Sequence, residues 1–184
     1  MKLKKCKQCG IKFTPVRAIQ PCCSFEHTAT YAMALVEKKN KRELAKTKRE
    51  HKAKLVAMKS LTQLANEAQV LFNQWIRNCR DKSEPCISCG RYHTGQYHAG
   101  HYRTRGSAAH LRFDEDNCHK QCAPCNNHLS GNIVNYRAGL IAKIGIERVE
   151  AIENNNATHK WTREELIEIK NHYKIRIKQH QAIF

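Results

Sequence analysis

Two Cys-x-x-Cys pairs enclose the middle of the chain and restrict how it can fold more than any other feature. The pairs are Cys86 with Cys89 and Cys122 with Cys125. Each pair can supply two corners of a tetrahedral zinc ion, so together they can form a closed site of four thiolates. A closed site leaves no position for a substrate. Its predicted role is therefore to hold the intervening residues in place.

The cysteine pattern favours metal binding over disulfide formation. The chain has ten cysteines, and six of them lie in Cys-x-x-Cys pairs. We expect no secretory signal at the start of the chain, and without export such pairs hold metal more often than they form disulfides.

A second predicted zinc site lies near the N-terminus. Cys6 and Cys9 form the third Cys-x-x-Cys pair, and Cys22, Cys23 and His27 follow. Cys23 and His27 are four residues apart, about one helical turn, so both can point at one ion. We expect a small finger held by Cys6, Cys9, Cys23 and His27. Cys22 remains the alternative to Cys23 as third ligand.

The charge of the chain indicates a polyanionic partner. It has 33 Lys and Arg against 16 Asp and Glu in 184 residues, a formal net charge of +17. Such an excess is typical of proteins that bind nucleic acid or an anionic membrane. No apolar run approaches the roughly 20 residues that span a bilayer, so we expect no membrane association.

The strongest basic segment is a predicted helix over residues 28–59. Between residues 37 and 59 there are ten Lys and Arg and three Glu, with no stripe of large apolar residues. This pattern is typical of a solvated helix. A charged surface explains it, but the overall charge favours an arm that contacts DNA phosphates through Lys46, Lys48 and Lys52.

The flanking regions are predicted to be helical. Ser60 and Gln63 form a capping-box pattern before an apolar stripe from Leu61 to Trp75, which packs within the chain or against a second copy. A further stripe from Ile133 to Ile144 ends at Gly145, a short helix covers 147–153, and Thr162 with Glu165 begins a last helix.

The residues between and beside the central cysteine pairs have the chemistry of a phosphodiesterase. His101 is the candidate general base, because imidazole titrates near neutral pH. Asn126 offers an amide oxygen to a hard cation. Asn117 would hold the loop that aims His101, and Arg103 and Arg105 would bind the flanking phosphates.

These motifs carry two resemblances. The stretch from Cys86 to Asn126 resembles the zinc-containing His-Asn-His nucleases, among them the junction-cleaving endonuclease VII of phage. The chain as a whole resembles the NinG (Rap) recombination proteins of lambdoid phages. The resemblance implies a ββα-metal unit, catalytic Mg²⁺ or Mn²⁺, and cleavage of branched DNA such as Holliday junctions and D-loops. The resemblance also implies that the protein acts in the cytoplasm of the bacterial host.

The sequence departs from the endonuclease VII pattern at one position. An acidic metal ligand precedes the base in that pattern, but here the residue is Gly100. His98, two residues earlier on the same predicted strand, could replace that ligand. His128, two residues beyond Asn126, is the alternative.

Other histidines and cysteines have no distinctive spacing. We expect three histidines on the surface and two cysteines as small buried packing residues. They are His93, His110 and His119, and Cys79 and Cys118.

The prediction is an α-rich α+β protein with four parts. They are a zinc finger (1–30), a basic helix and a packing helix (31–82), the nuclease unit (83–131) and C-terminal helices (132–184). We expect a homodimer, because resolving a junction needs two matched cuts. The alternative is a non-catalytic zinc protein that only binds nucleic acid.

Overall fold

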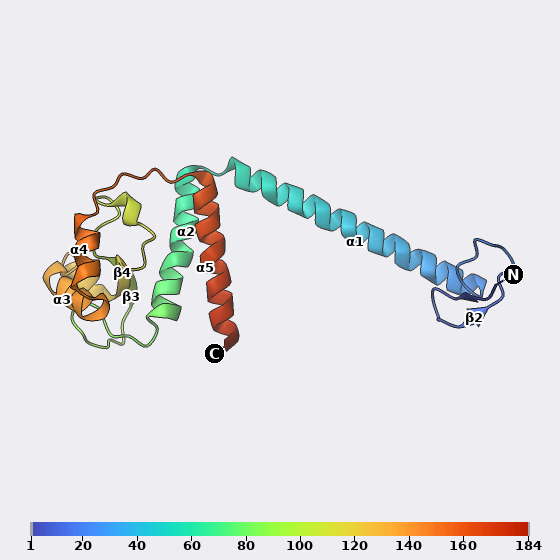
Figure 1. Ribbon diagram of the computed structural model, residues 1–184, viewed down its shortest axis with the longest axis horizontal. Coiled ribbons are helices and arrows are strands. Elements are labelled where there is room, and N and C mark those ends of the chain that lie inside the picture. The colour runs from blue at the N-terminus through green and yellow to red at the C-terminus, as the bar shows by residue number, and fades with distance from the viewer. Residues whose placement is uncertain (1, 184) are drawn as a thin grey trace. The chain divides into compact units, whose positions relative to one another are not determined.

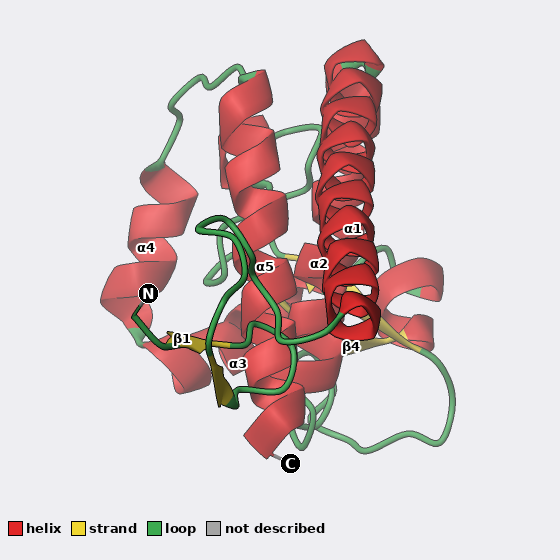
Figure 2. Cartoon of the chain, turned by 90° about the vertical axis from the view of Figure 1, so that its right-hand side faces the viewer, coloured by secondary structure: helices red, strands yellow, loops and turns green. Residues whose placement is uncertain are grey.

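The computed structural model describes residues 2–183. The chain divides into two compact units, residues 1–58 and 59–184. Helices predominate, and the strands of the described residues form two antiparallel two-stranded sheets (Figure 2). The structure thus confirms a helix-rich α+β protein. No helix within residues 2–183 is long and apolar enough to cross a membrane.

The first unit is a small cysteine-rich knot that leads into one long helix. Strands β1 (Lys4–Lys5) and β2 (Lys12–Phe13) pair beside the first cysteines. Helix α1 (Phe25–Met58) follows, and Ser24 Oγ accepts a hydrogen bond from the His27 amide at its start. None of the α1 side chains is buried. This is the solvated basic helix predicted from the sequence.

In the second unit, two helices pack side by side and run in the same direction, with Arg163 bonded to the Lys59 carbonyl near the start of both and Lys170 paired with Glu67 further along (Figure 1). Helix α2 (Leu61–Trp75) begins with the predicted capping box of Ser60 and Gln63. Helix α5 (Arg163–Ile183) lies along α2 and covers its apolar face (Figure 1). The stripe considered for pairing with a second copy is therefore buried inside the chain from Leu64 to Trp75, whereas Leu61 at its start is exposed.

The central strands and short helices lie beside this pair. Strands β3 (Tyr97–His101) and β4 (Cys118–Cys122) are antiparallel, with His101 opposite Cys118. The remaining elements are η1 (Ile76–Arg80), η2 (Ala109–Leu111), η3 (Pro124–His128), α3 (Ile133–Ile144) and α4 (Ile146–Asn154). Gly145, with φ of 85°, separates α3 from α4 as the sequence predicts.

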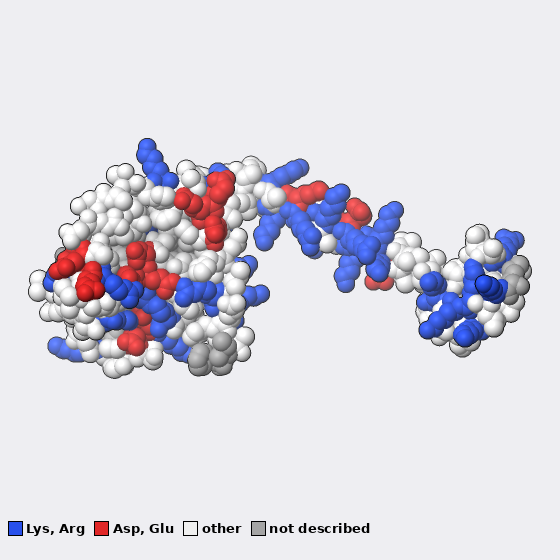
Figure 3. Space-filling view, viewed as in Figure 1, with Lys and Arg blue, Asp and Glu red and all other residues white. Residues whose placement is uncertain are grey.

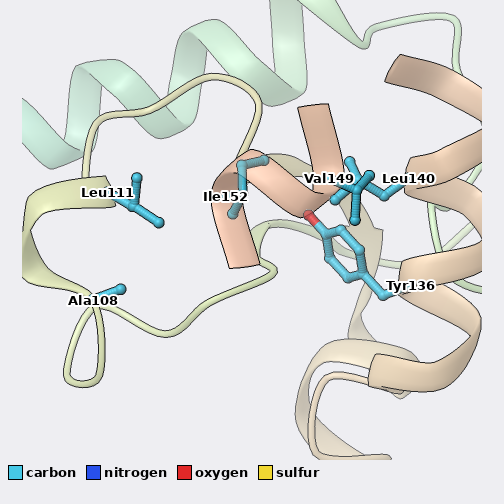
Figure 4. Close-up of a cluster of buried hydrophobic side chains, with 6 residues drawn as sticks. All are labelled: Ala108, Leu111, Tyr136, Leu140, Val149 and Ile152. Atoms are coloured by element: carbon cyan, nitrogen blue, oxygen red, sulfur yellow. The ribbon is translucent and has the colours of Figure 1, made fainter. Parts of the chain in front are cut away.

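A compact apolar cluster fixes β3 to the C-terminal helices (Figure 4). It contains Tyr136 and Leu140 of α3, Val149 and Ile152 of α4, and Ala108 and Leu111 of the loop between the strands. The Tyr136 hydroxyl donates to the Gly100 carbonyl oxygen at 2.8 Å. The cluster thereby positions the strand that carries His98 and His101.

Buried Asp81 joins three elements around the strands. Its carboxylate accepts hydrogen bonds from Arg80, from the Lys120 amide at 3.0 Å and from Lys143 Nζ at 2.9 Å. Burial alone would raise the pKa of Asp81, but Arg80, Lys143 and the amide outweigh it and lower the pKa to about 2. The carboxylate is therefore charged at neutral pH and links η1, β4 and α3.

Candidate functional site

The four central cysteines converge at one point. The sulfur atoms of Cys86, Cys89, Cys122 and Cys125 all lie within 4.8 Å of one another. Four thiolates at about 2.3 Å from a zinc ion are roughly 3.8 Å apart, so a small contraction around an ion is enough. The cluster can hold zinc, as predicted.

Backbone amides favour the thiolate form of one cysteine in this cluster. The Cys122 amide donates to Cys86 Sγ at 3.3 Å. Burial raises the pKa of the Cys86 thiol, but the amides of Cys122, Cys89 and Ser88 outweigh burial and lower the pKa to about 7. A thiolate is therefore accessible near neutral pH, which metal binding requires.

The N-terminal cluster repeats this design. In each of the two clusters, the first Cys-x-x-Cys pair is followed by a glycine with positive φ. These glycines are Gly10, with φ of 75°, and Gly90, with φ of 66°. In the N-terminal cluster, Cys23 Sγ lies 3.7 Å from Cys9 Sγ and 3.1 Å from His27 Nδ1.

The geometry of the N-terminal cluster favours Cys23 over the adjacent Cys22 as the third thiolate ligand. The ligand atoms of Cys6, Cys9, Cys23 and His27 lie within 4.8 Å of one another, whereas Cys22 is fully buried outside this set. The predicted ligand set, with Cys23 as its third thiolate, thus has the geometry to hold zinc.

A polar cavity of about 440 Å³ opens beside the central cluster. Its walls come from β3, the loop after it, η3 and the α2–η1 junction. The lining residues are Asn73, Arg77, His98, Ala99, His101, Thr104, Arg105, Asn126, Ser130, Gly131 and Ile133. The structure thus brings together four residues that the sequence analysis selected: His98, His101, Arg105 and Asn126.

His101 is oriented by the backbone. Its Nε2 lies 2.9 Å from the carbonyl oxygen of Arg112. Because a carbonyl oxygen only accepts, Nε2 must carry the hydrogen, and Nδ1 keeps the lone pair. Nδ1 is 3.8 Å from Cys118 Sγ, a long contact to a weak donor. Burial, followed by the charges of Arg105 and Arg112, lowers the pKa of His101.

Asn117 holds the loop that contains Arg112. Its side chain is fully buried. Oδ1 accepts from the Arg103 amide at 2.8 Å, and Nδ2 donates to the carbonyls of Arg103 at 3.0 Å and Leu111 at 3.2 Å. Asn117 therefore acts as a positioning residue away from the cavity.

Asn126 and His98 are candidate ligands for a further cation, in addition to the two zinc clusters. Asn126 Nδ2 donates to Oδ1 of Asn127 at 2.7 Å, so the amide oxygen of Asn126 is the end suited to a cation. His98 lines the same cavity, with Nε2 3.5 Å from Asn127 Nδ2. His128 is exposed and lies outside the described cavity lining. The geometry therefore favours His98 over His128.

The absence of an acidic residue at position 100 has a steric cause. A Cβ atom on Gly100 would lie 2.2 Å from Oε1 and 3.0 Å from Cβ of Gln121. The Gln121 side chain is fixed there, donating to Ser88 Oγ at 2.7 Å and to the Gly131 carbonyl at 2.6 Å. Gln121 thus occupies the space that an acidic side chain at this position would need.

The two arginines after His101 differ in their surroundings. The Arg103 guanidinium donates to the carbonyls of Ile152 at 2.9 Å and Asn155 at 2.5 Å, so it caps the end of α4. Arg105 is exposed and lines the cavity. Arg105 is therefore better placed than Arg103 to bind a phosphate.

Some residues differ from the sequence prediction. His119, expected on the surface, is buried, and burial lowers its pKa to about 3, because its strand faces the apolar cluster. His93 is half-buried with Nε2 3.2 Å from Cys89 Sγ.

Arg77 lines the cavity but could not be selected from the sequence. Its guanidinium donates to the Tyr97 carbonyl at 3.0 Å, a contact between residues 20 positions apart. Cys79 and Cys118 are buried as expected.

The basic arm presents its charges to solvent. Lys46, Lys48 and Lys52 are all exposed on α1. In Figure 3 the Lys and Arg side chains project from this helix beyond a first part that has no Lys or Arg. Such an array can contact a phosphate backbone without sequence readout.

The comparison with protein families gives one clear result. The family model described as bacteriophage lambda NinG protein matches residues 1–182. The chain belongs to the NinG family.

Individual NinG proteins match over most of the chain. The NinG protein of Escherichia phage 933W is 42% identical over 95% of this chain and 92% of its own length. The NinG protein of Enterobacteria phage H19B is 43% identical, over 91% of this chain and 88% of its own. The NinG protein of Salmonella phage P22 is 46% identical over 69% of this chain and 62% of its own. No solved structure matches. The cavity and cysteine clusters described above therefore belong to a NinG protein.

Proposed function

We propose that this NinG protein is a metal-dependent endonuclease that cleaves branched DNA, including Holliday junctions and D-loops. It acts in the cytoplasm of the bacterial host, as a homodimer that makes paired cuts. The zinc clusters hold the fold, and the cavity beside the central cluster carries out the hydrolysis.

One observation carries this proposal: His98, His101, Arg105 and Asn126 line a single cavity. These residues come from β3, the following loop and η3, and η3 also contains Cys125 of the central cysteine cluster. A protein that only binds nucleic acid has no need of an oriented, neutral imidazole beside cation ligands. This constellation is what metal-assisted phosphodiester hydrolysis requires.

His101 is the proposed general base. The Arg112 carbonyl keeps the hydrogen on Nε2, so Nδ1 is the atom that would take a proton from the attacking water. The lowered pKa keeps the ring neutral at pH 7, when it can accept that proton. The water oxygen forms the new P–O bond as the bond from phosphorus to the sugar oxygen breaks, and that leaving oxygen takes a proton from solvent.

The cavity offers a cation two ligands, the imidazole of His98 and the amide oxygen of Asn126. No carboxylate is among the described residues that line it. This mixed set suits a transition ion such as Mn²⁺ better than Mg²⁺, which prefers oxygen ligands. A cation bound there supplies charge stabilisation at the scissile phosphate. Arg105 is the proposed contact to a flanking phosphate.

The experiment compares matched linear, flapped and four-way DNA substrates, each end-labelled, with added Mn²⁺ or Mg²⁺. We expect cutting of the branched substrates and little cutting of the linear duplex. The alternative, a zinc-containing binding protein, would shift the mobility of the four-way junction without cutting it. Sedimentation of the same sample tests the dimer.

A further inference from the structure

A second cavity in residues 59–184, of about 400 Å³, has aromatic walls. Phe113, Trp161 and Tyr173 contribute rings to it, and Asp114 and Glu168 contribute carboxylates. The remaining lining residues are His110, Ile169 and His172. The proposed hydrolytic chemistry does not use this cavity.

Trp161 is held rigidly at the cavity. Its Nε1 donates to the Ala109 carbonyl at 3.0 Å. Its ring packs edge to face against Phe113, with centroids 5.1 Å apart and planes at 79°. An aromatic ring fixed in this way loses little conformational freedom when a planar ligand stacks on it.

The charge of this cavity selects against phosphate. The chain carries a net charge of +17, yet no Lys or Arg is among the described residues that line this cavity. Its lining includes two carboxylates, those of Asp114 and Glu168. They would repel a phosphate group. A neutral planar ring that carries an amino group fits instead, because it can stack on the aromatic walls and donate N–H hydrogen bonds to a carboxylate.

The cavity is close to the candidate base. The buried Phe72 ring lies 5.9 Å from the Phe113 ring and 6.1 Å from the His101 ring. Phe113 also follows Arg112, whose carbonyl orients His101. A DNA strand cut at His101 could therefore place a nearby nucleotide at the aromatic cavity.

We propose that this cavity binds an unpaired nucleobase of branched DNA, stacked on Trp161 with its amino group toward Glu168. The inference rests on DNA being the substrate, and it adds how a branch is distinguished from a continuous duplex. Bases in a duplex are stacked and paired, whereas a D-loop, a flap or a four-way junction opened at its crossover offers unpaired bases that can enter an aromatic pocket. Thymine has no exocyclic amino group, so the cavity should prefer cytosine, adenine and guanine over thymine.

The test measures DNA affinity of the full-length chain without added Mg²⁺ or Mn²⁺, so that no cutting is needed. One duplex carries a bulge of unpaired cytosines, a second a bulge of thymines, and a third is fully paired. For Trp161→Ala we expect roughly a 5- to 150-fold loss of affinity for the cytosine bulge, the usual range for removing one stacking platform. Affinity for the paired duplex should be unchanged.

Three further variants sharpen the result. Trp161→Phe keeps a ring and should retain most of the bulge affinity. Glu168→Gln, at an exposed side chain, should reduce the preference for cytosine over thymine. Tyr92→Ala is the matched control, since Tyr92 is an exposed aromatic outside the cavity lining.

The inference fails if Trp161→Ala and Trp161→Phe leave the bulge affinity unchanged, or if both weaken the paired duplex equally. It also fails if Glu168→Gln keeps the full cytosine preference. Binding with this pattern but no cutting under any metal would instead contradict the proposed hydrolysis and leave the cavity assignment standing.

Discussion

Nε2 of His101 lies 2.9 Å from the backbone carbonyl oxygen of Arg112, eleven residues further along the chain. This contact joins the end of β3 to the loop that Asn117 holds with three hydrogen bonds. It fixes both the orientation and the tautomer of the imidazole. A backbone carbonyl cannot be removed by substitution, so the arrangement depends on the fold around it.

The first prediction concerns pH. Burial and two arginine charges hold the pKa of His101 below its ordinary value of 6.5. Single-turnover cutting should therefore be constant above neutral pH and fall as pH decreases through this lowered pKa, because the protonated ring cannot act as base. Arg105→Gln removes one of the charges and should move the acid limb to higher pH. An acid limb that stays in place in this variant would contradict the assignment.

The second prediction separates His98 from His128. If His98 holds the catalytic cation, His98→Ala should reduce cutting at low Mn²⁺ and recover part of it at high Mn²⁺, because a lost ligand weakens the site and leaves the base intact. His128→Ala, exposed and outside the cavity lining, is the matched control. A metal titration showing the defect in His128→Ala alone would reverse the assignment.

The third prediction concerns the cysteine clusters. The purified chain should contain two equivalents of zinc by elemental analysis. Cys89→Ser should lose one equivalent and unfold the region around β3 and β4, because structural zinc supplies folding free energy. Cys9→Ser should lose the other equivalent and leave the α2–α5 pair folded. Cys79→Ser, at a buried cysteine outside both clusters, should keep both ions.

Retention of both zinc ions in Cys89→Ser, measured on folded protein, would exclude the four-thiolate site. Circular dichroism of each variant distinguishes loss of the ion from general misfolding.

The fourth prediction concerns the arm. Replacing Lys46, Lys48 and Lys52 with Gln should weaken binding to DNA of any sequence. It should also reduce the slope of log affinity against log salt by up to roughly 2.7, because each phosphate contact contributes about 0.9. Glu43→Gln with Glu50→Gln on the same helix is the control and should not weaken binding. An unchanged slope in the lysine variant would mean that the arm does not contact phosphate.

The local features of this chain could be predicted because they depend on neighbouring residues. The capping box at Ser60, the helix end at Gly145 and the convergence of Cys6, Cys9, Cys23 and His27 all follow from short spacings. The helix starting near Thr162 is confirmed as well, with the Glu165 amide donating to Thr162 Oγ1 at 3.3 Å. Such signals act within a few residues.

Other features could not be predicted because they depend on contacts between distant segments. Gln121 occupies the space beside Gly100, and Arg103 is held by carbonyls about fifty residues away. The covering of α2 by α5 and the buried environment of His119 also follow from packing of the whole second unit. No local sequence pattern at these positions indicates which distant residue each of them contacts.

The central claim is tested most directly by cleavage of a labelled four-way junction with Mn²⁺ by the parent chain and by His101→Ala. The account predicts junction cutting by the parent and a loss of about 10²–10⁴ in rate for the variant, the usual cost of removing a general base. Junction affinity and zinc content should be unchanged. Equal cutting by the two proteins, or no cutting by the folded, zinc-loaded parent, would contradict the proposed function.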